Sequence, residues 1–117
     1  MYKKKEIGQI GEDLATKYLE ENNYKIIQRN FLCKQGEIDI IAKQGKEYVF
    51  TEVKTRTNLS FGRPVEAVTD TKQKHIKEAT KYYLYINKLE NQYIRIDAIE
   101  IFLFKNRYKI NHIKQIM

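Results

Sequence analysis

The chain has 117 residues, 42% of them hydrophobic, which is typical of one soluble domain with a single packed core. Its formal charge is +7, and most of the surplus lies in residues 60–117, which carry 11 basic and 6 acidic side chains. A lone cysteine, Cys33, excludes an internal disulfide and a cysteine-based zinc site, and no apolar run approaches transmembrane length. We therefore expect one domain over residues 1–117, in the cytoplasm and not in a membrane. Its charge favours polyanions such as nucleic acids, although many small basic domains bind none.

Hydrophobic residues recur at helical spacing near the N-terminus, at Ile7, Ile10, Leu14 and Tyr18. This spacing predicts an amphipathic helix over residues 6–21. Glu12 lies at the edge of its buried face, beside the small residues Gly8 and Ala15, which would let another element approach closely. A carboxylate at such an edge is either a satisfied structural group or part of a site.

Strand-forming residues fill the next part of the chain. Residues 24–33 predict a first strand, and residues 37–42 and 47–54 predict two more. The polar turn between the last two contains Gly45 and indicates a β-hairpin. The third strand is mostly apolar until its polar end, which is typical of a strand in the middle of a sheet.

The hairpin would bring charged residues face to face. If Gly45 opens a two-residue loop, the numbers of paired residues sum to 91, so Asp39 lies opposite Glu52 and Glu37 lies opposite Lys54. All four side chains would then share one face of the sheet. A bulge or a longer loop would shift the register by one residue and put Asp39 and Glu52 on opposite faces.

The second half begins with a loop and a helix. Residues 55–69 contain the only proline, Pro64, and predict a loop beside the charged hairpin end. Asp70 or Thr71 can cap a second helix that runs to about Asn87. Its expected buried stripe is Ile76, Ala79, Tyr83 and Ile86, and its lysines are Lys72, Lys74, Lys77, Lys81 and Lys88. These lysines either form a solvated face or, interleaved with tyrosines, contact phosphates and bases.

Two further strands complete the pattern, over residues 93–104 and 107–113. The order of helix, strand, hairpin, helix and two strands predicts an α/β domain with a mixed sheet, whose third and fourth strands are joined by a crossover containing the second helix. His75 and His112 fall outside the charged motifs, and we expect exposed or packing roles for both.

An Asp that faces a Glu in a sheet requires a cation, either a metal ion or a lysine, because like charges there are destabilising. Mg²⁺ binds oxygen ligands and usually keeps several waters, and Asp39 with Glu52 would supply such a partial shell. Lys54, two residues along the strand, would orient an attacking water or stabilise the phosphorus centre. Glu12 or Glu37 could add a carboxylate through a water.

Several segments together carry a resemblance: 8–12 (GQIGE), 29–30 (RN), 36–42 (GEIDIIA), 50–56 (FTEVKTR) and 95–97 (RID). They closely resemble the YraN-like family of small bacterial proteins, and the likeness spans nearly the whole chain. That family is similar to the restriction-endonuclease-like PD-(D/E)XK nucleases, among them the archaeal Holliday junction resolvases. The resemblance implies a three-layer fold, with a mixed central β-sheet flanked by helices.

The resolvases use a helix Glu, a strand Asp and a Glu-x-Lys. Matched residue by residue, these catalytic roles fall on Glu12, Asp39, Glu52 and Lys54, with the three carboxylates as ligands for Mg²⁺ or Mn²⁺. Ile38 replaces a proline that is dispensable in the superfamily pattern. Related nucleases often carry a polar residue near the site, early in the second helix, where this chain has Gln73.

The resemblance therefore implies a metal-dependent nuclease that hydrolyses DNA phosphodiesters, as an endonuclease or exonuclease, on branched, nicked or single-stranded DNA. The expected nucleic-acid contacts are Arg56, Arg63, Lys72 and Lys74. Junction-cutting relatives act as dimers, so the formation of a homodimer is left as an open alternative. Two other classes also stay open, a module on the same fold that binds nucleic acid without cutting it and a protein-interaction domain.

A purely structural account of the charged residues is also open. In that account Glu37 and Lys54 form an ordinary cross-strand ion pair. Asp39 and Glu52 are then satisfied by the backbone and by Arg56 or Arg95.

Overall fold

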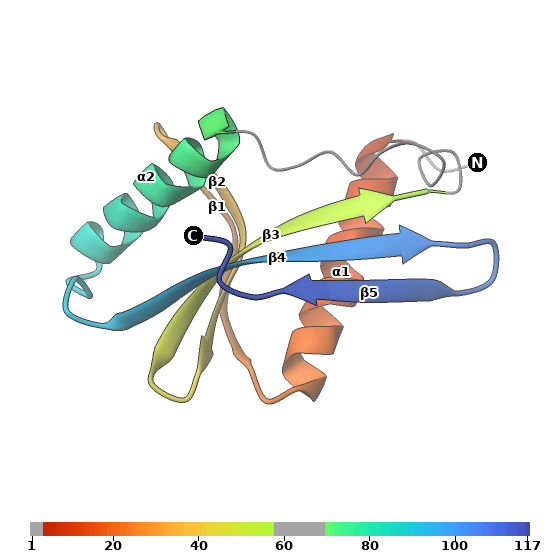
Figure 1. Cartoon of the computed structure of the whole chain (residues 1–117), viewed down its shortest axis with the longest axis horizontal. Helices are drawn as coiled ribbons and strands as arrows, with labels where there is room; N and C mark the ends of the chain where they lie inside the picture. The colour runs from red at the N-terminus through yellow and green to blue at the C-terminus, as the bar shows by residue number, and fades with distance from the viewer. Residues whose placement is uncertain (1–3, 58–69) are drawn as a thin grey trace.

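The computed structural model describes residues 4–57 and 70–117 (Figure 1). The elements are α1 (Lys4–Glu21), β1 (Lys25–Cys33), β2 (Gly36–Gln44), β3 (Glu47–Arg56), α2 (Asp70–Ile86), β4 (Tyr93–Leu103) and β5 (Tyr108–Ile113). Each prediction of a helix or strand is confirmed, with bounds within two residues of those expected. Arg63 and Pro64 lie outside the described residues.

The five strands form one sheet in chain order, from β1 to β5. Neighbouring strands are antiparallel except β3 and β4, which are parallel. Parallel neighbours need a crossover connection, and α2 lies in it. With α1 and α2 on opposite faces of the sheet, the molecule has three layers (Figure 1). The α/β class with a mixed sheet is confirmed, and the arrangement is consistent with a restriction-endonuclease-like fold.

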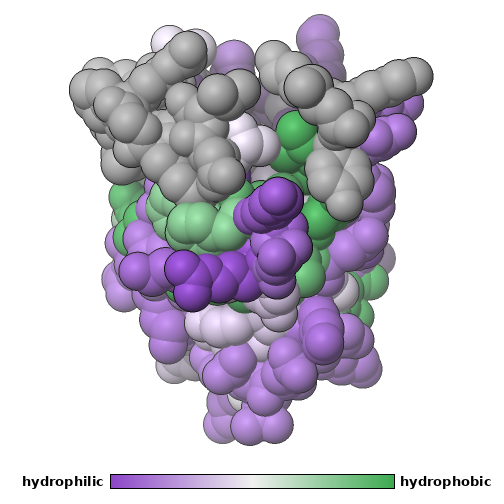
Figure 2. Space-filling view, turned by 90° about the vertical axis from the view of Figure 1, so that its right-hand side faces the viewer, coloured by the Kyte–Doolittle hydropathy of each residue, from purple (hydrophilic) through white to green (hydrophobic). Residues whose placement is uncertain are grey.

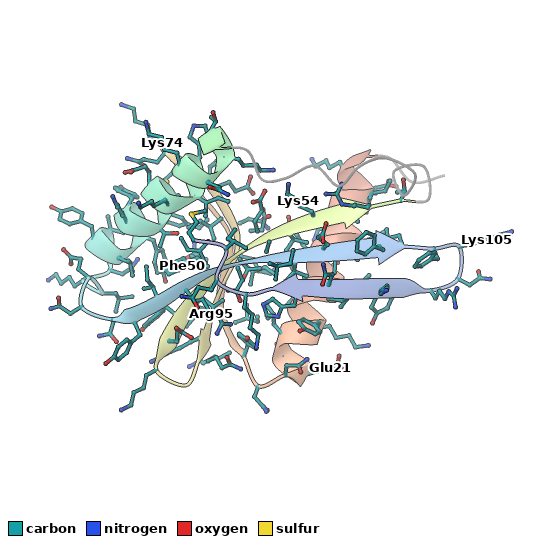
Figure 3. All side chains as sticks on the ribbon, in the orientation of Figure 1. Glu21, Phe50, Lys54, Lys74, Arg95 and Lys105 are labelled. Carbon is teal, nitrogen blue, oxygen red and sulfur yellow. The ribbon has the colours of Figure 1, made fainter. Side chains whose placement is uncertain are left out.

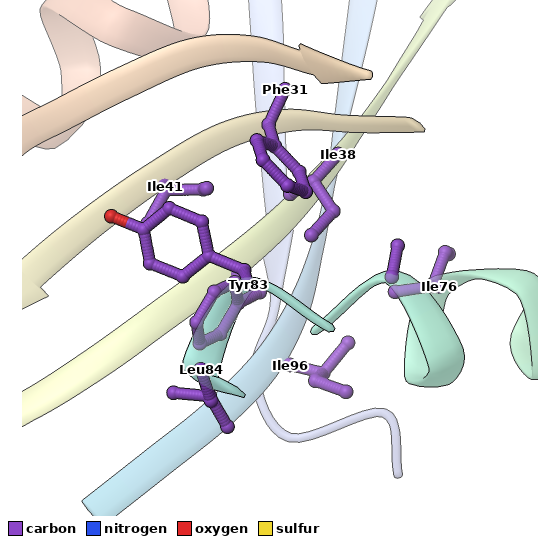
Figure 4. Packing of buried hydrophobic residues seen from close by; sticks show 9 residues of the cluster. Phe31, Ile38, Ile41, Ile76, Tyr83, Leu84 and Ile96 are labelled. Atoms are coloured by element: carbon purple, nitrogen blue, oxygen red, sulfur yellow. The ribbon is translucent and has the colours of Figure 1, made fainter. Parts of the chain in front are cut away.

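Each face of the sheet has its own hydrophobic core. The core under α2 contains Phe31, Ile38, Ile41, Phe50, Ile76, Ala79, Tyr83, Leu84 and Ile96 (Figure 4). The core under α1 contains Ala15, Leu19, Tyr24, Ile40, Ala42, Val49, Ile99 and Ile101. The ring of Tyr83 packs edge-on against Phe31 and Phe50, at centroid distances of 5.2 and 5.6 Å. α2 is therefore anchored to β1, β2 and β3, and the last two of these strands carry Asp39 and Glu52.

One residue of the expected α2 stripe was wrong. Ile86 is 47% exposed, and Leu84 is buried in its place. With 3.6 residues per turn, Leu84 and Ile86 lie about 80° to either side of Ile76, and the helix buries the side of Leu84, which Thr80 shares.

At one end of the described part of the molecule, the surface is mainly hydrophilic (Figure 2). Figure 2 views the end at the right of Figure 1, where hydrophobic side chains reach the surface in patches between hydrophilic ones. Neither α1 nor α2, the two described helices, is long and apolar enough to cross a membrane.

α1 approaches β3 closely at Gly11. A Cβ atom built on Gly11 would collide with Oγ1 of Thr55 and lie 2.9 Å from its Cβ atom. No side chain fits at this crossing, so the helix can lie against the strand only because residue 11 is glycine. Gly8, one turn earlier, faces open space.

We expect Gly11→Ala to lower the free energy of unfolding by about 1–3 kcal/mol, because the added methyl overpacks the contact with Thr55. The matched Gly8→Ala variant should raise it by about 0.5–1 kcal/mol, since alanine favours the helix and meets no neighbour. Urea unfolding followed by circular dichroism measures both values. Equal effects of the two substitutions would show that the crossing is not closely packed.

Candidate active site

The β2–β3 hairpin has the expected register. Gly45 and Lys46 form a two-residue loop, and the paired residues run from Gln44 with Glu47 to Ile40 with Thr51. The numbers of each pair sum to 91, as predicted. The pairing ends at Ile40 with Thr51, so Asp39 and Glu52 are the next residues beyond it.

Beyond this point a side chain replaces the missing backbone partner. The backbone N–H of Val53 donates a hydrogen bond to Oδ2 of Asp39, at 2.7 Å. A buried N–H requires an acceptor, and the carboxylate supplies it where the ladder between β2 and β3 has ended. Asp39 is thereby fixed beside β3.

On the side of Asp39 that faces β1, the β1–β2 hairpin is twisted. Ile38 packs in the core under α2, whereas Ile40, two residues on, packs in the core under α1. Regular alternation would put both on one face. Asn30, at the register position facing Asp39, has a positive φ of 54°, which breaks the regular strand there. The end of the hairpin therefore turns toward α2.

Gly36 lets the turned hairpin end lie against α2. Its φ is +152°, a conformation that favours glycine. A Cβ atom built on it would lie 3.3 Å from Cβ of His75. The close contact brings the start of β2 beside the first turns of α2.

These elements enclose a hollow of about 320 Å³. It is lined by Gly36, Glu37, Asp39, Glu52, Val53, Lys72, His75 and Ile76. Three carboxylates and one ammonium group thus share a small space between β2, β3 and α2. Asp39, Glu52 and Lys72, three of the predicted site residues, come together here, as does the additional candidate Glu37.

Burial raises the pKa of Asp39 from 3.8 to about 7. The hydrogen bond from Val53 lowers it, but the negative charges of Glu12, Glu37 and Glu52 raise it further. Such an acid is poised between its neutral and charged forms near neutral pH. A nearby cation would favour the charged form.

Glu52 is held on one side only. Its side chain is 8% exposed, and its Oε1 atom lies 2.6 Å from Nζ of Lys72. Its Oε2 atom is buried and has no hydrogen-bond partner among the described residues. A buried carboxylate oxygen without a donor is costly, so this atom marks a place where a cation or donor would bind favourably.

Lys54 follows Glu52 by two residues and projects from the same face of β3. It does not line the hollow, and it makes no hydrogen bond or ion pair within the described ranges. Figure 3 shows its side chain near the end of the strand. The cross-strand pair between Glu37 and Lys54, which the structural account requires, is not formed.

Glu12 lies outside the hollow, but its charge reaches Asp39. The carboxylate of Glu12 accepts a long hydrogen bond of 3.4 Å from Arg29, which also pairs with Asp13 at 2.9 Å. Its negative charge nevertheless raises the pKa of Asp39.

The other expected nucleic-acid contacts are divided. Arg56 is 15% exposed and its Nε atom donates to Glu100 at 3.2 Å, so its guanidinium is largely buried within the protein. Lys74 is exposed and lines a neighbouring hollow with Lys34 and His75. Gln73 lines a separate hollow against Ile116 and Met117, away from Asp39 and Glu52. Arg63 lies outside the described residues.

Sequence reasoning missed His75, which lies one turn after Lys72 on the same face of α2 and lines the hollow. The helical spacing was visible, but nothing in the sequence placed that face over the hairpin end.

A second buried charge cluster was also missed. Asp97 accepts hydrogen bonds from Arg95 at 2.8 and 2.9 Å and contacts Nε2 of His112 at 2.7 Å. Burial would raise the pKa of Asp97, but the bonds from His112 and Arg95 hold it below its ordinary value. Arg95 therefore pairs with Asp97 and does not compensate the charge of Asp39 or Glu52.

The hollow fits a hard divalent cation with a partial protein shell. Over residues 4–57 and 70–117, no three His, Cys, Asp or Glu side chains lie close enough to enclose a metal ion. Mg²⁺ often takes only one or two carboxylates and completes its shell with water and substrate phosphate. Asp39 and Glu52 provide that number, and the unpartnered Oε2 atom of Glu52 is a suitable ligand.

Comparison with known proteins gives a consistent family. The model of a family described as "Uncharacterised protein family UPF0102" matches residues 11–101. A UPF0102 protein of Caldicellulosiruptor saccharolyticus is 47% identical over 100 residues, which cover 86% of this chain and 85% of the relative. One from Clostridium perfringens is 49% identical over 112 residues (94% and 92%), and one from Clostridioides difficile is 47% identical over 109 residues (93% and 94%). The chain therefore belongs to UPF0102, the YraN family.

Proposed function

We propose that this protein is a metal-dependent nuclease that hydrolyses DNA phosphodiester bonds in the hollow between β2, β3 and α2. The observation that carries the proposal is the meeting of Asp39 and Glu52 where β2 and β3 stop pairing, with lysines beside them. Both acids are poorly compensated, and a divalent cation would relieve both.

Asp39 and Glu52 would hold the metal ion. When bound, a divalent ion supplies an acidified water and neutralises charge on a phosphate. The N–H of Val53 orients the carboxylate of Asp39, and the buried position of Glu52 keeps its carboxylate away from bulk water. Lys54 would place its ammonium beside the attacking water or the phosphate, since its side chain has no competing partner within the described ranges.

Lysines at the edge of the hollow, here called the basic rim, surround its carboxylates, here called the acidic floor. This arrangement supports a polyanionic substrate. Lys34 and Lys74 border the neighbouring hollow, which shares His75 with this one. Such a rim would attract a phosphate backbone toward the carboxylates, which on their own would repel it. Because Arg56 is largely buried, the rim lysines would make most of these contacts.

The same lysines would also serve a module that binds nucleic acid without cutting it. The two functions differ in what the carboxylates do, so substitutions that preserve shape separate them. The DNA structure that the site prefers can be found with a panel of single-stranded, duplex, flapped and four-way-junction substrates.

We expect the wild-type protein to cleave at least one of these DNAs in Mg²⁺ or Mn²⁺. Glu52→Gln and Lys54→Ala should lower the cleavage rate by about 100-fold or more, because one removes a metal ligand and the other a cation at the phosphate. Gel assays of labelled substrates measure the rates.

The matched controls are Glu20→Gln on α1 and Lys25→Ala on β1, both exposed and outside the hollow, which should cleave like the wild type. Cleavage that persists in Glu52→Gln would contradict the proposal. DNA binding without cleavage in every protein, with salt-sensitive affinity, would instead favour the binding module.

The pKa of Asp39 gives a prediction for stability. Since its pKa rises from 3.8 to about 7 on folding, the folded state favours the protonated acid, and stability is lost as pH rises from about 4 to about 7. Asp39→Asn cannot titrate and keeps an acceptor for Val53. In EDTA, we expect the free energy of unfolding of this variant, relative to that of the wild type, to rise by about 2 kcal/mol between pH 5 and pH 8.

Urea unfolding at both pH values measures this difference. At pH 8, added Mg²⁺ should raise the melting temperature of the wild type and leave that of Asp39→Asn unchanged. The exposed Glu20→Gln variant is the control and should follow the wild type at both pH values. If the free energy of unfolding of Asp39→Asn followed the same pH dependence as that of the wild type, the pKa of Asp39 would not be raised in the folded state.

A further inference from the structure

Three acids in the described chain are buried, namely Glu52, Asp97 and Glu100. Two of them pair with cationic side chains that are largely buried. Asp97 is held by Arg95, which is itself 11% exposed, and by His112. Glu100 accepts hydrogen bonds from the largely buried Arg56 and from Asn111. Glu52 differs, because its ion-pair partner is a lysine.

Lys72 reaches Glu52 from solvent. Its side chain is 52% exposed, although its Nζ atom lies 2.6 Å from Oε1 of the buried carboxylate. An ammonium on a flexible stem can return to water at small cost, whereas a buried guanidinium that lost its partner could not. The pair between Lys72 and Glu52 is thus the exchangeable one of the three.

The pair also leaves Glu52 incompletely satisfied, since Oε2 remains buried without a partner among the described residues. Glu37 and Asp39 line the same hollow and add negative charge. A single ammonium therefore compensates only part of the charge that the hollow can carry. A divalent cation would compensate more, but it would have to share Glu52 with Lys72 or displace it.

We propose that Lys72 is an internal counter-ion that competes with the divalent metal for Glu52, and that it leaves the carboxylate when the metal binds. This inference rests on the proposed metal site. Lys72 stabilises the metal-free protein and lowers its metal affinity, because its positive charge lies within a few ångströms of the ion.

A phosphate at the rim would draw the ammonium of Lys72 away from Glu52. By linkage, binding of DNA and of metal then favour each other through this one side chain. The metal site would be fully available only when a phosphate backbone is present.

The test is Mn²⁺ binding to the full chain, measured by isothermal titration calorimetry without DNA. We expect Lys72→Ala to bind Mn²⁺ on the order of tenfold more tightly than the wild type. Lys72→Arg keeps the charge and should bind no more tightly than the wild type. Lys77→Ala, on the same helix but outside the hollow, should match the wild type.

Thermal unfolding gives a second measurement. Metal-free Lys72→Ala should melt below the wild type, because Glu52 loses its counter-ion, and Mn²⁺ should raise its melting temperature by more than that of the wild type. If Lys72→Ala fails to fold without metal, Lys72→Gln replaces it in both measurements.

Glu52→Gln separates the two levels of the inference. If it loses Mn²⁺ binding while Lys72→Ala binds like the wild type or more weakly, the metal site stands and the role of Lys72 is overturned. If Glu52→Gln binds Mn²⁺ as tightly as the wild type, or if neither the wild type nor Lys72→Ala binds it, the metal site falls as well. Tighter binding by Lys72→Ala, lost again in the double variant with Glu52→Gln, supports the competition.

Discussion

The end of pairing between β2 and β3 is the constraint on which the site depends. After Ile40 and Thr51 the ladder stops, and the carboxylate of Asp39 takes the place of a backbone acceptor for Val53. This one hydrogen bond lets the hairpin end turn toward α2 without leaving a buried N–H unpaired. It also draws Asp39 into a poorly solvated position beside Glu52, which raises its pKa.

The molecule treats its buried charges in two ways. Asp97 receives bonds from Arg95, His112 and the backbone of Gln115, so it is a stable part of the architecture. Asp39 is half-buried and Glu52 is buried, and both have too few donors, which lowers the stability of the metal-free fold. Proteins retain such local costs mainly where function requires them, and this contrast distinguishes the carboxylates of the hollow from the well-paired carboxylates of Asp97 and Glu100.

The sequence predicted the parts of the site that depend on local geometry. A two-residue loop at Gly45 sets the register, and period-two alternation places Lys54 on the face of Glu52. Contacts between residues that are distant in the chain could not be predicted from the sequence. Arg56 was expected at nucleic acid but pairs with Glu100, which lies on another strand, and the α2 face of His75 meets the hairpin only through the crossover. The first pairing depends on which strands are neighbours in the sheet and the second on how the layers pack, and periodicity encodes neither.

The acidic floor and the basic rim have opposite needs. The carboxylates of Asp39 and Glu52 favour a cation, whereas the lysines around them favour an anion. A metal ion alone would leave the rim uncompensated and would meet repulsion from Lys72, and a polyanion alone would meet the negative floor. A phosphodiester that arrives with a divalent ion satisfies both sets at once. This mutual requirement argues for phosphodiester chemistry more strongly than either charged group does alone.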